Sequence, residues 1–158
     1  MKIGIILDPL SALKVKKDST VAIMAEAASR GHEIHVMMQE AVMWKSGRVV
    51  GENLRLTLTG AADHWYRAAP PVETPLAEFD AVLMRKDPPF EAEYLTSTGL
   101  LEQAESEGAR VFNNPSAIRD HSEKLAIMQF AQFTVPTLVT RLPGQIHDFI
   151  DANGDVIV

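Results

Sequence analysis

Residues 2–9 read Lys-Ile-Gly-Ile-Ile-Leu-Asp-Pro, a short apolar run that ends abruptly in an acid and a proline. Such a run is typical of a strand that is buried on both faces, as in a parallel sheet. Asp18 is a suitable N-cap for a helix with an apolar stripe over residues 21–28, and Gly31 is a suitable residue to end it. Residues 33–38 are again largely apolar, so the chain is predicted to open with a right-handed β-α-β unit.

The stretch 41–59 follows a different pattern. Ser46-Gly47 forms a turn signal between two short apolar runs, and residues 54–58 alternate leucine with arginine or threonine. A period of two is typical of a half-exposed strand, so we expect an antiparallel hairpin at the edge of the sheet. The prolines between residues 70 and 75 predict a loop after this hairpin.

The parallel α/β pattern returns after that loop. Residues 80–84 predict a buried strand and residues 110–112 a shorter one, separated by a helix over 91–107 that ends at Gly108. The helix residues expected to face inward are Leu95, Leu100, Leu101 and Ala104. Together these patterns predict an α/β fold in which helices cover both faces of a mostly parallel sheet.

The C-terminal stretch predicts a helix over residues 122–130, an extended segment over 136–140 and a second helix over 146–152. Residues 155–158 follow Gly154 and predict an apolar strand on which the chain stops. Natural chain ends are usually polar or poorly ordered, so we expect the chain to be a piece of a longer protein.

Composition limits the possible functions. The 158 residues suffice for one α/β domain of ordinary size, and the absence of cysteine excludes disulfides, thiolate metal sites and a cysteine nucleophile among them. The net charge of −6 argues against general nucleic-acid binding. The apolar run at the start is too short for a signal peptide or a membrane span, so we expect a soluble, cytoplasmic protein without a membrane partner.

Three predicted strands end in polar residues, namely Asp8, Arg85-Lys86-Asp87 and Asn113-Asn114. Ligands of open α/β sheets bind outside the carboxyl ends of the strands, so all three segments are candidates for one crevice. Arg85 has a planar guanidinium group, whose fork of N–H donors can bind a carboxylate or a phosphate through two parallel hydrogen bonds. The alternative is an ion pair between Arg85 and a carboxylate of the protein itself, and composition alone favours this structural role.

Other residues could also serve a ligand. Lys14, Lys16 and Lys17 form a basic cluster that either faces an anion or lies in a solvated loop. Ser19 falls in the first turn of a helix, where free N–H groups bind anions or are simply capped. Lys124 lies near a helix start, where the dipole disfavours a cation. The five histidines are too dispersed for a metal site, and the common catalytic motifs are absent, so no metal ligand or catalytic residue is assigned.

Several segments of the sequence resemble bacterial glutathione synthetases, in the same order and at similar spacings along the whole chain. They cover residues 4–9, 16–20, 83–90, 113–120 and 123–125. The most specific part is Met-Arg-Lys-Asp-Pro-Pro-Phe at residues 84–90.

The resemblance implies membership of the ATP-grasp superfamily. Residues 1–120 would form the Rossmann-like pre-ATP-grasp domain, and residues 121–158 would begin the central ATP-grasp domain. The implied reaction is the ATP- and magnesium-dependent ligation of γ-glutamylcysteine to glycine through an acyl phosphate, in a homo-oligomer. The magnesium carboxylates, the glycine site and a further ATP lysine would lie in the missing two-fifths or so of the enzyme, so the isolated chain is expected to be inactive.

The resemblance also implies roles for particular residues. Arg85 would hold γ-glutamylcysteine, and Asp8, Lys17 and Ser19 would line the same cleft. Lys124 would contact ATP. One alternative is another ATP-grasp ligase that joins amino acids or peptides, which the 84–90 segment argues against because related ligases lack it. A second alternative is a non-catalytic domain that binds a small molecule, which a gene ending at residue 158 would favour.

Overall fold

The computed structural model describes residues 1–61, 64–87, 89–122 and 124–157. The chain forms two compact units, Met1–Ser122 and Glu123–Val158. Within the described residues, no helix combines the length and the apolar character that crossing a membrane requires.

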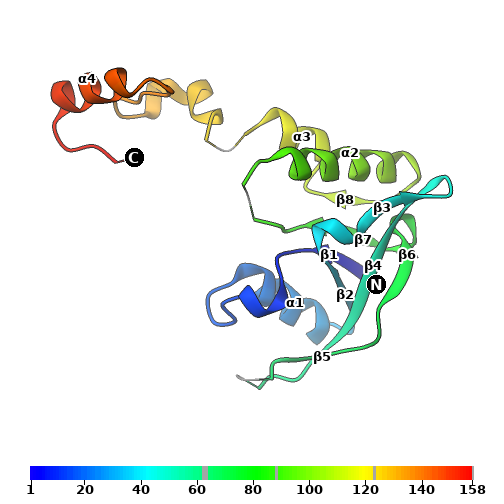
Figure 1. Ribbon diagram of the computed structural model, residues 1–158. Helices are drawn as coiled ribbons and strands as arrows, with labels where there is room; N and C mark the ends of the chain where they lie inside the picture. The colour runs from blue at the N-terminus through cyan, green and yellow to red at the C-terminus, as the bar shows by residue number, and fades with distance from the viewer. Residues whose placement is uncertain (62–63, 88, 123, 158) are drawn as a thin grey trace. The chain divides into compact units, whose positions relative to one another are not determined.

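The centre of the first unit is a parallel sheet. Its strands are β1 (Lys2–Ile6), β2 (Glu33–Met37), β7 (Ala81–Met84) and β8 (Val111–Phe112). Helix α1 (Ser19–Ser29) connects β1 to β2, α2 (Ala92–Ser106) connects β7 to β8, and the two helices cover opposite faces of the sheet (Figure 1). The predicted α/β fold, with parallel strands and helices on both faces, is confirmed.

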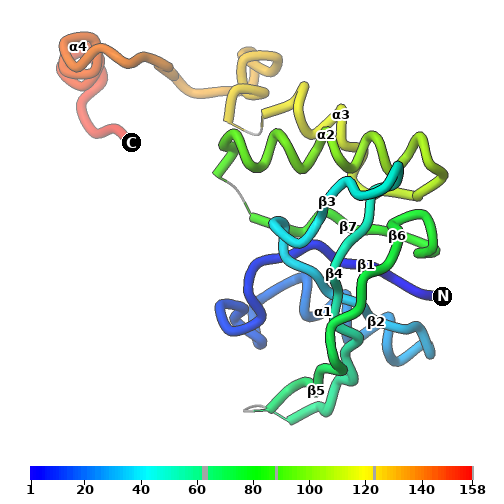
Figure 2. The backbone as a smooth tube through the Cα atoms, turned by 45° about the vertical axis from the view of Figure 1, so that its right-hand side comes forward, coloured from blue at the N-terminus to red at the C-terminus, as the bar shows by residue number. Residues whose placement is uncertain are grey.

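An antiparallel extension continues the sheet beyond β2. Its strands are β3 (Val42–Lys45), β4 (Arg48–Leu58), β5 (Tyr66–Ala68) and β6 (Val72–Pro75). The described residues thus form an eight-stranded sheet in the order β3-β4-β2-β1-β7-β8, with β5 and β6 paired to β4. β4 runs the length of the extension, from β3 to β5 (Figure 2).

The turn between β3 and β4 explains the hairpin. Ser46 and Gly47 have φ angles of 52° and 86°, and two successive positive values suit the tight turns that match the twist of a hairpin. The hairpin predicted over residues 41–59 is therefore confirmed. The loop predicted for residues 70–75 is wrong in part, because β6 occupies residues 72–75. Among the described strands, β6 pairs with β4 alone, and an edge strand tolerates the missing N–H of proline.

Side chains of β1 alternate between the two faces and so enter two hydrophobic cores. Ile5 belongs to the core that contains Met24 of α1, whereas Ile6 belongs to the core that contains Leu101 of α2. Both isoleucines are fully buried, and each such burial contributes about 1.5–3 kcal/mol. Strand β1 is therefore anchored from both sides, and the residues that follow it have a fixed starting point.

Helix α2 agrees with its prediction in extent and, except at Leu95, in the residues expected to face inward. Leu101 and Ala104 are buried as expected, whereas Leu95 is 41% exposed. Thr98, which was not among the residues expected to face inward, is fully buried, and its hydroxyl donates to the carbonyl of Leu95 at 2.7 Å. Because this hydroxyl is satisfied within the helix, a polar residue can occupy the inward face.

The second unit departs most from the sequence patterns. Its helices are a 3-10 helix η4 (Ala126–Phe133) and α4 (Pro143–Asn153), so α4 confirms one prediction, while the helix expected over 122–130 is displaced and of another type. Residues 136–140 lie outside any helix, which is compatible with the expected extended segment, whereas residues 155–157 form no strand and residue 158 lies outside the described residues. Neither η4 nor α4 buries a residue in the structure of this chain. Helical stability in proteins comes mostly from packing of an apolar face, so burial here does not help to define where these helices begin and end.

Candidate functional site

The candidate site lies where the strand order reverses. From β1 the chain crosses through α1 to β2, whereas from β7 it crosses through α2 to β8 on the other side, so the carboxyl ends of β1 and β7 flank a switch point. Crossovers that diverge in this way leave a crevice above the strand ends, where α/β proteins bind their ligands. Asp8 follows β1 closely, and Arg85, Lys86 and Asp87 follow β7.

Asp8 joins these two strand ends. Its Oδ1 atom lies 2.8 Å from Nζ of Lys86, and its Oδ2 atom accepts a hydrogen bond from the backbone N–H of Asp87 at 3.0 Å. Burial alone would raise the pKa of Asp8, but the hydrogen bond and charge of Lys86, together with the N–H of Asp87, outweigh burial and lower the pKa. The charge of Asp8 is therefore compensated within the protein.

Arg85 reaches from the end of β7 to the start of α1. Its Nη2 atom donates to Oγ of Ser19 at 2.9 Å, and its Nε atom donates to Oγ1 of Thr20 at 3.3 Å. Hydroxyl groups orient a guanidinium but do not neutralise it. Within the described part of the chain, no carboxylate forms an ion pair with Arg85, so its charge remains available to a ligand.

The start of α1 is held in place by its cap. Oδ1 of Asp18 accepts hydrogen bonds from the backbone N–H groups of Thr20 at 2.7 Å and Val21 at 3.3 Å, which confirms the predicted N-cap. The cap fixes the first helical turn, and with it the hydroxyls that orient Arg85. The positive end of the helix dipole adds to the positive potential there.

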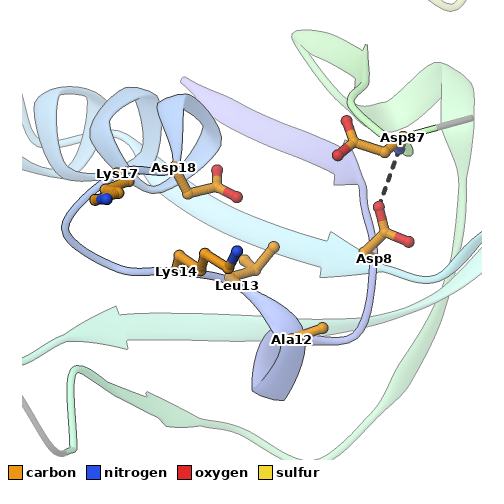
Figure 3. Close-up of a pocket in the computed structure, with 7 residues that line it drawn as sticks. All are labelled: Asp8, Ala12, Leu13, Lys14, Lys17, Asp18 and Asp87. Atoms are coloured by element: carbon orange, nitrogen blue, oxygen red, sulfur yellow. Dashed lines mark hydrogen bonds between the residues drawn. The ribbon is translucent and has the colours of Figure 1, made fainter. Parts of the chain in front are cut away.

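Two adjoining cavities of about 350 and 220 Å³ occupy the switch point. Both are lined by Asp8, Leu13, Lys17, Asp18 and Asp87. Ala12 and Lys14 complete the larger cavity, and Ser19, Thr20 and Arg85 complete the smaller one. Figure 3 shows the carboxylates of Asp18 and Asp87 on facing sides of the larger cavity.

The structure brings together the residues that the resemblance singled out for substrate. Asp8, Lys17, Ser19 and Arg85 all line the smaller cavity. Lys14 and Lys17 are exposed and have no ion-pair partner among the described residues. The site thus combines a compensated acid, an oriented guanidinium and free ammonium groups, a combination suited to an anionic or dipolar small molecule.

The Asn113-Asn114 segment and Lys124 were also expected to serve a ligand. Asn114 caps the short helix α3 (Pro115–Asp120), where its side chain accepts a hydrogen bond from the N–H of Ala117 at 2.9 Å, and neither it nor Asn113 lines the two cavities. The expectation of one crevice for all three strand ends is therefore supported for the segments after β1 and β7 and stays a prediction for this one. Lys124 is exposed in a turn of the second unit. Pro88 of the loop after β7 lies outside the described residues.

The described residues contain no group of three His, Asp or Glu side chains that could hold a metal ion. At the switch point the reason is visible, because Asp8 is engaged by Lys86 and Asp18 caps a helix. A magnesium site therefore does not fit the described carboxylates of this cleft.

Two further residues of the site were not among those that the resemblance singled out for substrate. Thr20 is 4% exposed and supports Arg85, and Asp87 lines both cavities. Asp87 was expected in the crevice only as part of the segment that follows the 80–84 strand. Whether its carboxylate is available to a ligand could not be predicted, because that depends on where Asp8 and Lys86 direct their side chains.

Comparison with known proteins gives the same picture. Residues 1–119 match the family model described as the N-terminal domain of prokaryotic glutathione synthetase. A glutathione synthetase of Ralstonia nicotianae is 55% identical over 157 residues, which cover 99% of this chain and 48% of that protein. The corresponding protein of Nitrosomonas europaea is 49% identical over 161 residues, covering 100% of this chain and 50% of its own length.

The likeness extends to more distant relatives. A glutathione synthetase of Shewanella oneidensis is 39% identical over 158 residues, again covering 100% of this chain and 50% of that protein. The chain spans about half the length of the curated relatives it matches, a smaller share than the resemblance implied. By the family model and by these relatives, the chain belongs to the prokaryotic glutathione synthetase family.

Proposed function

We propose that this chain is the dipeptide-binding part of a cytoplasmic ATP-dependent ligase that joins γ-glutamylcysteine to glycine and so forms glutathione. Membership of the family supports this reaction, since the relatives described above are named glutathione synthetases. The observation that carries the proposal is the oriented, uncompensated guanidinium of Arg85 in the smaller cavity.

γ-Glutamylcysteine carries two carboxylates, one that reacts and one that does not. Arg85 binds the non-reacting carboxylate of the γ-glutamyl group through its planar fork, which fixes orientation as well as position. Lys17 and the start of α1 add positive potential on the facing side of the cavity. The cysteinyl carboxylate is thereby left free to react.

The reaction requires that this dipeptide be bound in a fixed position and orientation. ATP transfers its terminal phosphoryl group to the cysteinyl carboxylate, and the amine of glycine then attacks the acyl phosphate and displaces phosphate. Alignment of the reacting groups lowers the barrier because the loss of translational and rotational freedom has already occurred on binding. This chain contributes binding and orientation, while Asp8 and Lys86 hold together the two loops that do the orienting.

ATP belongs to a different part of the proposed enzyme. Residues 121–158 begin the central ATP-grasp domain, and Lys124 contacts the nucleotide from there. Magnesium is proposed for the complete enzyme, with ligands outside this chain, and no step of the dipeptide's binding depends on it. The homo-oligomeric state is likewise a proposal, which light scattering on the full-length enzyme tests.

A coupled assay tests the function. The full-length enzyme is mixed with ATP, γ-glutamylcysteine and glycine, and both phosphate release and glutathione are measured, the latter by mass spectrometry. We expect glutathione to form in a one-to-one ratio with phosphate. Formation of a different peptide in preference to glutathione, or no dependence on γ-glutamylcysteine, contradicts the proposal.

A further inference from the structure

The described cleft carboxylates differ in what already engages them. Asp8 receives Lys86 on one oxygen and the N–H of Asp87 on the other. Asp18 uses Oδ1 to accept two N–H groups of α1. The carboxylate of Asp87 has no hydrogen bond or ion pair with any described residue, although it lines both cavities. Asp87 is thus the described cleft acid with both carboxylate oxygens open to a cation from a ligand.

We propose that Asp87 binds the α-ammonium group of the γ-glutamyl substrate and so makes the site selective for a free α-amino group. The inference rests on the proposed function, because it assigns a role within the dipeptide site. It concerns specificity and not the chemical step, since the α-amino group takes no part in forming the peptide bond.

The spacing of the two charged groups supports this role. Arg85 and Asp87 come from the same short segment after β7, and both line the smaller cavity. An α-amino acid head group carries its carboxylate and its ammonium on one carbon atom, so a cation and an anion from one loop suit both charges at once. Figure 3 shows the Asp87 carboxylate turned away from its own loop toward the side of the cavity formed by Asp18.

Asp8 holds the backbone that carries Asp87. The hydrogen bond from the Asp87 N–H to Asp8 fixes the backbone from which the Asp87 side chain projects. Lys86, the nearest lysine in sequence, is directed to Asp8 and to the carbonyl of Asp87, so it does not neutralise the Asp87 carboxylate. An uncompensated acid in the cleft discriminates by charge, because a substrate without the ammonium leaves it unpaired.

The test pairs one side chain with one group of the substrate. N-glutarylcysteine is γ-glutamylcysteine without its α-amino group. In the full-length enzyme we expect kcat/KM for γ-glutamylcysteine to exceed that for N-glutarylcysteine by about tenfold to a hundredfold, the range of a charge-assisted hydrogen bond. In Asp87→Asn the ratio should fall to within about threefold of unity, mainly through a loss with γ-glutamylcysteine.

Asp18→Asn is the matched control, because asparagine caps a helix as well as aspartate does while removing the other acid that faces the cavity. We expect this variant to keep the preference for the ammonium-bearing substrate. A preference that survives in Asp87→Asn, an equal loss with both substrates, or a preference abolished by Asp18→Asn instead overturns the proposal. In those cases glutathione synthesis by the unaltered enzyme still supports the proposed function, whereas an enzyme that makes no glutathione refutes both.

Discussion

The Nζ atom of Lys86 lies 2.8 Å from Oδ1 of Asp8, and this ion pair joins the segments that follow two neighbouring parallel strands. Both side chains are about three-quarters buried, with exposed fractions of 24% and 26%. Because Lys86 is engaged in this way, Arg85 is left as the cation from the β7 loop that lines the smaller cavity. Two adjacent basic residues therefore have different roles, one in holding the loops and the other in facing a ligand.

Asp8→Asn should make the stability of the protein less dependent on pH. The folded state lowers the pKa of Asp8, so the ionised carboxylate stabilises the fold above the ordinary value of 3.8, and this contribution is lost as the pH falls through the lowered pKa. We expect a loss of about 0.5–1 kcal/mol at pH 7 and no difference from the unaltered chain near pH 2. Urea unfolding at both pH values measures this, and Lys86→Met should reproduce the loss at pH 7.

In the full-length enzyme, Arg85→Ala should weaken the binding and use of γ-glutamylcysteine far more than those of ATP. Loss of a charge-assisted contact lowers kcat/KM for the dipeptide by about tenfold to a hundredfold. Arg85→Lys should recover little, because an ammonium cannot reproduce the planar fork. Steady-state kinetics for each substrate, with a melting curve on the same preparation, distinguish this role from a structural one. A lower melting temperature with unchanged kinetics for the dipeptide would end the substrate-binding proposal.

The 158-residue chain on its own should show no ligase activity and should bind Mg-ATP weakly at best. The described residues offer no group of three acidic or histidine side chains for a metal, and we propose that most nucleotide contacts come from the other half of the enzyme. Calorimetry with Mg-ATP tests this expectation. Binding in the micromolar range by the isolated chain contradicts it.

Two glycine substitutions should have opposite effects on stability. A Cβ atom at Gly51 of β4 would lie 2.5 Å from Sδ of Met37, so Gly51→Ala must displace a buried side chain and should cost about 1–3 kcal/mol. A Cβ atom at Gly99 of α2 meets nothing within 4 Å, so Gly99→Ala should stabilise the protein by about 0.5–1 kcal/mol. Thermal melting of both variants checks the sign of each change.

Local pattern predicted much of the first unit. The apolar run of β1, the N-cap at Asp18 and the turn at Ser46-Gly47 each depend on residues within a few positions of one another, and each is confirmed. The inward face of α2 was predicted incorrectly at Leu95, because apolar character alone does not show that Thr98 satisfies its hydroxyl within the helix. The second unit was predicted least well, and its helices bury no residue in the structure of this chain, so burial there does not fix the helix bounds.

The sequence by itself determined which segments could form the site, because strand ends, caps and the 84–90 segment are local features. Only the tertiary structure decided which side chains are free to act. Arg85 and Ser19 are 66 positions apart, and Asp87 and Asp8 are 79 apart, so their hydrogen bonds exist only once β1, β7 and α1 are packed together. Whether a charge is compensated depends on such long-range partners, and that is why Asp8 proved to be engaged and Asp87 open.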